Sequence, residues 1–139
     1  MKASAILIVA LAAVVGVVPL LTDCLAEGQT LATADGRQVP MKCHWTAIAE
    51  FALAVPLLGV GASLWFSRRK ETRRPLALLG MIIGALVILL PTALIGVCQH
   101  PDATCNLVMR PTLILSGTLV MGISMLSLVV SERRAEQIA

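Results

Sequence analysis

The sequence predicts an all-α membrane protein built as a four-helix transmembrane bundle. Apolar residues make up 58% of the chain and charged residues only 14%, with a mean hydropathy of +0.89, whereas a soluble domain carries about 25% charged residues. Four apolar runs each reach the ~20 residues that cross a hydrocarbon core of ~30 Å. The remaining connections are too short for a separate soluble domain. We therefore expect one domain over residues 1–139, with spans at 3–21, 46–66, 76–97 and 112–130.

The basic residues predict the orientation of the bundle. The connection at 67–75 holds five of the 11 Lys and Arg residues, and three more flank the chain ends: Lys2, Arg133 and Arg134. Short basic connections stay cytoplasmic. We therefore expect a bacterial inner-membrane protein with both termini cytoplasmic and the loops at 22–45 and 99–110 extracytoplasmic. Because these cations flank spans and have no aromatic platform beside them, they do not predict nucleic-acid binding.

The first span is expected to stay in the mature protein. Lys2 before the apolar run also fits a cleaved signal peptide, but the run at 3–21 exceeds the signal-peptide core of about 7–15 residues. In the loop that follows, Asp35-Gly36 lies between two short strand-like runs. Glycine accepts a positive φ, so this dipeptide favours a tight turn. A small β-hairpin is predicted there.

The second span carries two interface anchors and one buried charge. Trp45 and Trp65 are 20 residues apart, which is ~30 Å along a helix, so the two indoles are expected at opposite membrane interfaces. Glu50 lies about 7.5 Å deeper than Trp45, where an unpaired carboxylate is costly. We expect an ion pair with Arg110 at the outer start of the fourth span, with a proton or metal role for Glu50 as the alternative.

The third span contains a helix breaker and a packing motif. Pro91 is expected to kink the helix, since it removes a backbone hydrogen bond. Gly80 and Gly84 form a G-x-x-x-G pair, which permits close contact between helices in lipid. Packing is therefore the expected role of both glycines.

The four cysteines lie in the two loops predicted to be outside. An oxidising compartment favours disulfides, paired within each loop as Cys24 with Cys43 and Cys98 with Cys105. Each bond would close a short loop and stabilise the fold by about 3 kcal/mol or somewhat less. The order of span, cysteine, polar loop, cysteine and span occurs twice, which suggests a parallel repeat of two helical hairpins.

Two other functions use the same cysteines. The segment Met41-Lys42-Cys43-His44 offers a thioether, a thiolate and an imidazole, which suit copper or a haem iron, and His100 and Met109 are further candidate ligands in the second loop. A DsbB-like membrane thiol-disulfide oxidoreductase also uses four helices with two outward cysteine pairs. Neither pair here has the C-x-x-C spacing of such enzymes, and the chain has no Tyr and only 3% aromatic residues for a quinone pocket.

The segment from Pro40 to Glu50, P-M-K-C-H-W-T-A-I-A-E, together with Ile95-Gly96-Val97-Cys98 and the following Cys105, resembles the domain of unknown function 4418 family. These are small bacterial four-span proteins, and the resemblance covers nearly the whole chain. Family members tend to be associated with ABC transporters whose permease is MacB/FtsX-like. The second loop cysteine of the family is often followed by histidine, whereas Asn106 stands here, which favours a structural role for the loops.

These observations favour a noncatalytic accessory or regulatory subunit of an ABC-type export system. Its expected partners are the lipid bilayer and a membrane permease. No resident cofactor is predicted, with copper or haem kept as the alternative. No motif in the chain states a reaction, so an enzyme is disfavoured.

Overall fold

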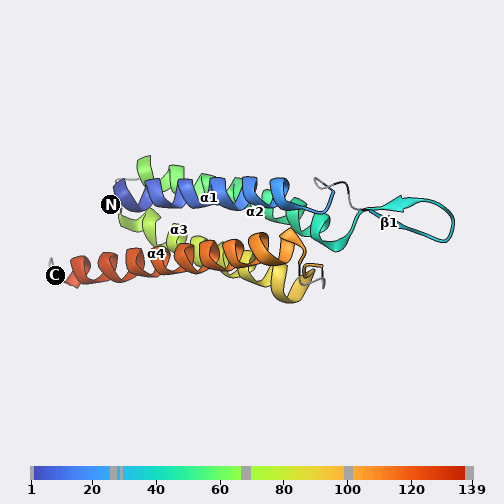
Figure 1. The fold of residues 1–139 in the computed structure, drawn as a ribbon. Helices are drawn as coiled ribbons and strands as arrows, with labels where there is room; N and C mark the ends of the chain where they lie inside the picture. Colours follow the sequence, from blue (N-terminus) through green and yellow to red (C-terminus); the bar gives the residue numbers. More distant parts are fainter. Residues whose placement is uncertain (1, 26–27, 29, 67–69, 99–101, 137–139) are drawn as a thin grey trace.

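The computed structural model describes residues 2–25, 28, 30–66, 70–98 and 102–136. Four long helices form a bundle, and the predicted fold class is confirmed (Figure 1). Each helical segment is long and apolar enough to cross a membrane. The helices are α1 (Lys2–Thr22), α2 (Lys42–Phe66), α3 (Lys70–Leu89) and α4 (Arg110–Glu136).

The bundle is arranged as two helical hairpins. The most extensive contacts join α1 to α2 and α3 to α4, while the contacts between the two hairpins are smaller. Figure 1 shows the start of α1 and the end of α4 at one end of the bundle and the β-hairpin projecting from the other. We call this second end the hairpin end. Both interhelical loops that carry cysteines lie there, because α1 and α3 run toward it.

The loop between α1 and α2 forms the predicted β-hairpin. Strands β1 (Leu31–Ala32) and β2 (Gln38–Val39) pair antiparallel. Gly36 closes the turn at a φ of 74°, a conformation that an L side chain rarely adopts. The Gly36 amide donates to the Thr33 carbonyl at 2.9 Å. The Asp35-Gly36 dipeptide therefore forms the turn that its sequence indicates.

The bundle buries a continuous apolar core and exposes large apolar side chains around it. Ile8, Leu57, Leu113 and Val120 are fully buried, whereas Leu7, Leu58, Leu115 and other large apolar residues of all four helices are 40% or more exposed. Such a surface suits lipid tails. Trp45 and Trp65 are both about half exposed, near opposite ends of α2.

Gly80 and Gly84 lie where α3 meets α4. A methyl group on Gly84 would come 2.9 Å from Met121 Cγ and 3.0 Å from the Gly117 carbonyl oxygen, and one on Gly80 would come 2.5 Å from Ser124 Oγ. The two backbones thus approach more closely than any larger residue would allow, which is how small residues pack helices in lipid.

Two π-helical turns lie beside the second cysteine-bearing loop. The first, η1 (Leu90–Leu94), contains Pro91 and ends the third span before the predicted residue 97. The amides of Ile95 and Gly96 both donate to the Leu90 carbonyl, and Gly96, at a φ of 80°, then turns the chain out of the helix. The second, η2 (Cys105–Met109), leads directly into α4. Such π turns are frequent at functional sites.

Candidate metal centre

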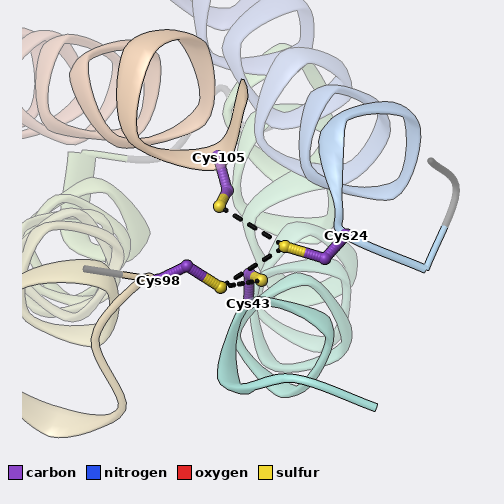
Figure 2. A group of neighbouring side chains, drawn as sticks. All are labelled: Cys24, Cys43, Cys98 and Cys105. Atoms are coloured by element: carbon purple, nitrogen blue, oxygen red, sulfur yellow. Dashed lines mark hydrogen bonds between the residues drawn. The ribbon is translucent and has the colours of Figure 1, made fainter. Parts of the chain in front are cut away.

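The four cysteines of the chain converge at the hairpin end of the bundle. Their Sγ atoms all lie within 4.8 Å of one another. Figure 2 shows the four side chains pointing toward a common centre, each from a different segment of the chain. Two come from the first helical hairpin and two from the second, namely Cys24, Cys43, Cys98 and Cys105. We call this group the four-sulfur cluster.

Local structure places each sulfur. Cys24 follows the end of α1, Cys43 lies in the first turn of α2, and Cys105 begins η2. Cys98 lies on the irregular segment after η1, and its position depends on α2: Thr46 Oγ1 donates a 2.8 Å hydrogen bond to the Gly96 carbonyl. This bond ties the second loop to the helix turn that carries Cys43.

The cluster is largely shielded from solvent. Cys24, Cys43 and Cys105 are buried, and Cys98 is half-buried. Burial, together with thiol contacts to Cys43, Cys98 and Cys105, raises the pKa of the Cys24 thiol well above its usual range. In the metal-free protein this group is therefore a neutral thiol at physiological pH. A bound cation would reverse this preference, because a metal binds the thiolate.

The sulfur spacing fits a single metal ion. A tetrahedral ion with metal–sulfur bonds of ~2.3 Å places its sulfurs ~3.8 Å apart. The Sγ of Cys24 lies 3.3 Å from that of Cys98 and 3.6 Å from that of Cys105, and the Cys43 and Cys98 sulfurs are 2.7 Å apart. Side-chain adjustments of about 1 Å or less would bring this group to the geometry of a mononuclear thiolate site.

The pairing of the cysteines in disulfides stays a prediction. All four are free thiols in the structure. The shortest contact joins Cys43 to Cys98, which belong to different loops, although the within-loop pairs also lie inside the 4.8 Å limit. The disulfide prediction treated the two loops as separate units, whereas the alternative metal site already drew ligands from both loops. Neither prediction brought all four sulfurs together. The available signal was that Cys24, Cys43 and Cys98 lie within three residues of a predicted span end, with Cys105 seven residues before the fourth span.

The other sequence-predicted ligands take different positions. Met41 lies beside the cluster, with its Sδ 3.8 Å from Cys98 Sγ. Met109 is fully buried one turn after Cys105. His44 stands outside the group of four sulfurs, and its Nδ1 lies 2.7 Å from Asp23 Oδ2. His100 lies outside the described residues.

The His44–Asp23 pair is a feature that sequence reasoning missed. Asp23 immediately precedes Cys24, and His44 immediately follows Cys43. The pair therefore links the end of α1 to the start of α2 next to two of the four sulfurs. Asp23 is buried, with its side chain only 6% exposed, while the His44 side chain is 22% exposed.

Glu50 is fully buried in α2, but the expected partner does not meet it. Neither carboxylate oxygen of Glu50 has a hydrogen-bond partner among the described residues. Arg110 is exposed at the start of α4. The predicted Glu50–Arg110 ion pair is therefore not formed in the structure. Cys43, Ala47 and Glu50 are all fully buried along one face of α2, so Glu50 lies two turns beneath the cluster.

Comparison with known proteins gives a family but no activity. No curated protein and no solved structure matches the chain. The sequence does match the family described as Domain of unknown function (DUF4418) over residues 3–130, which includes α2, α3, most of α1 and α4, and all four cysteines. The chain therefore belongs to the DUF4418 family of proteins.

Proposed function

We propose that this protein captures Cu(I) at the extracytoplasmic face of a bacterial inner membrane. The observation that carries the proposal is the convergence of four cysteine sulfurs within 4.8 Å. Soft thiolate donors select Cu(I), Zn(II) or iron–sulfur chemistry over hard cations. Cys24, Cys43, Cys98 and Cys105 would hold the ion.

The neighbouring side chains favour Cu(I) over Zn(II) and haem. Met41 adds a thioether 3.8 Å from Cys98 Sγ, and thioethers are soft ligands that suit Cu(I). Four thiolates alone also form structural zinc sites, so Met41 is the group that favours Cu(I) here. His44, the nearest histidine in sequence, has its Nδ1 against Asp23. Sulfurs gathered within 4.8 Å leave space for one ion at their centre rather than for a porphyrin ring.

The charge distribution supports an extracytoplasmic site. Five of the 11 Lys and Arg residues lie at 67–75, and three of them, Lys70, Arg73 and Arg74, are in the first turns of α3, at the opposite end of the bundle from the cluster. By the positive-inside rule that end is cytoplasmic, and the hairpin end is outside. Thiols in this oxidising compartment tend to form disulfides, and a bound metal would protect them.

Copper titration of the reduced protein tests the proposal. Purified full-length protein, reduced and kept without oxygen in mild detergent, is given Cu(I) in competition with a chromophoric Cu(I) chelator. We expect one copper per chain, loss of binding in Cys43→Ser and Cys98→Ser, and weaker binding in Met41→Leu. Met125→Leu is the matched control, since Met125 is exposed and lies toward the other end of α4.

Two results of this titration would contradict the proposal. Four titratable thiols that retain no Cu(I) would exclude copper capture. Retention of Zn(II) in preference to Cu(I) would keep the site but overturn the copper assignment.

The accessory-subunit and thiol-oxidoreductase predictions lead to different experiments. An ABC permease that copurifies with the protein in mild detergent would support the accessory role, which rests on the family resemblance. Reduction of a quinone by the reduced protein, with formation of a disulfide, would support the oxidoreductase role. Copper capture is compatible with an ABC permease as a partner, and it requires neither a permease nor a quinone.

A further inference from the structure

A hollow of about 770 Å³ opens beside the four-sulfur cluster at the hairpin end. Its size falls in the range of small-molecule sites. The wall is built mainly by η1 and the segment that follows it, together with the starts of α2 and α4. The residues that line it are Leu31, Lys42, Pro91, Thr92, Ala93, Ile95, Gly96, Val97, Cys98, Asn106 and Arg110.

The hollow is positively charged. Among the described residues, Lys42 and Arg110 are the charged groups of the lining, and no Asp or Glu is found there. Cations in short extracytoplasmic segments run against the positive-inside rule, so two of them at one hollow require a reason. An ion pair with Glu50 does not explain these cations, because the buried oxygens of Glu50 have no hydrogen-bond partner among the described residues.

Cys98 connects the hollow to the cluster. It lines the hollow, it is half-buried, and its Sγ lies 2.7 Å from Cys43 Sγ and 3.3 Å from Cys24 Sγ. The other three cysteines are buried. A metal ion that enters from the hollow therefore meets Cys98 first. Two cations at this entrance would repel a bare metal cation and attract an anionic complex.

We propose that the hollow receives Cu(I) as an anionic complex with a small carboxylated thiol and that Cys98 takes the ion by ligand exchange. The proposal rests on the copper function proposed above. Lys42 and Arg110 bind the carboxylates of the carrier, and Arg110 offers two parallel N–H donors to a carboxylate. Asn106 and Thr92 provide further polar groups in the lining.

The exchange step is balanced without an oxidant. The bond from copper to one carrier sulfur breaks, and a bond from copper to Cys98 Sγ forms. The Cys98 thiol proton passes to the sulfur of the leaving carrier, which departs as a thiol with its carboxylates still ionised. Copper remains Cu(I), and because one thiolate replaces another the charge of the copper and its bound sulfurs is unchanged. Transfer to Cys24 and Cys43 can then follow, since both sulfurs lie within 3.3 Å of Cys98 Sγ.

Rates of copper transfer from two donors test this inference. The anionic donor is the Cu(I) complex of glutathione, and the cationic donor is the Cu(I) complex of acetonitrile. Stopped-flow absorbance follows copper–thiolate formation in the full-length reduced protein and in the Lys42→Gln/Arg110→Gln variant. The matched control is Arg37→Gln, which removes an exposed cation of the β-hairpin that does not line the hollow.

We expect the double variant to accept copper from the glutathione complex about tenfold more slowly, because electrostatic steering changes association rates by roughly 10-fold to 1,000-fold. The rate at which the double variant takes copper from the acetonitrile complex should be unchanged or faster. Arg37→Gln should accept copper from both donors at the wild-type rates. The preference of the wild type for the anionic donor should weaken with added salt.

The outcomes separate this inference from the copper function itself. Equal rates from the anionic donor in wild type and double variant, or an equal slowing from both donors, would overturn the proposed entry route. Copper capture would still stand if the final stoichiometry remained one per chain. Failure of the wild type to bind copper from either donor would instead refute the copper function.

Discussion

Glu50 offers a direct test of how the bundle treats a buried carboxyl group. The residue is fully buried, and neither of its oxygens has a hydrogen-bond partner among the described residues. A buried polar group without a partner costs about 1–3 kcal/mol. Glu50→Leu removes both oxygens at similar volume, whereas Glu50→Gln keeps a polar group in the same place. We expect the free energy of unfolding of Glu50→Leu to exceed that of Glu50→Gln by about 1–3 kcal/mol.

Arg110 should not contribute to this effect. It is exposed at the start of α4 and makes no ion pair with Glu50. Sites without direct contact add within about 0.3–0.5 kcal/mol. The Glu50→Gln and Arg110→Gln substitutions should therefore be additive in a double-mutant cycle.

Unfolding of the reduced, metal-free protein in one detergent measures both quantities. A Glu50→Leu variant that is less stable than Glu50→Gln would show that the carboxyl group has a partner in the folded state. A coupling energy of about 1 kcal/mol or more between Glu50 and Arg110 would restore the ion pair that the sequence suggested. The expected result would mean that Glu50 is kept at the expense of stability, which is typical of intramembrane residues with a function.

Three further predictions follow from packing, orientation and titration. Gly84→Ala should destabilise the fold by about 1–3 kcal/mol, because the added methyl group overpacks against Met121. Gly59→Ala is the control and should be neutral or stabilising, because a methyl group there meets no atom within 4 Å. Equal melting temperatures of the two variants would contradict the close contact between α3 and α4. An impermeant thiol reagent on intact cells should label Asp35→Cys and not Arg133→Cys, and the reverse pattern would invert the proposed orientation. The pKa of the Cys24 thiol is raised in the folded protein, so as pH rises past ~8.5 this thiol ionises first in the unfolded chain. The free energy of unfolding of the metal-free protein should therefore fall above that pH. A Cys24→Ala variant whose stability has the same pH dependence would show that Cys24 does not cause the fall.

Local signals account for the parts of the fold that the sequence predicts. Apolar runs of membrane-spanning length locate four helices, and the Asp35-Gly36 dipeptide locates the turn between β1 and β2. Each of these features is contained in consecutive residues. Neither depends on how distant segments meet.

The site depends on contacts between segments, and these could not be predicted. Cys43 and Cys98 approach each other because Thr46 holds the Gly96 carbonyl across 50 positions of sequence. Arg110 was expected to face the bundle from its depth alone. Its neighbour Met109 is fully buried, and one residue turns a helix by ~100°, so Arg110 faces outward instead. Depth follows from counting residues, whereas rotation about the helix axis follows from packing.

The even division of the sulfurs between the two helical hairpins has a mechanical consequence. Each hairpin supplies two of the four donors, and the hairpins contact each other less than the helices within each of them do. An ion held by all four sulfurs would cross-link the two helical hairpins, because they could not separate at this end without breaking metal–sulfur bonds. At a free ion concentration 100 times the Kd, this resistance amounts to about 2.7 kcal/mol. Occupancy would thus set how freely the two halves of the bundle move relative to each other.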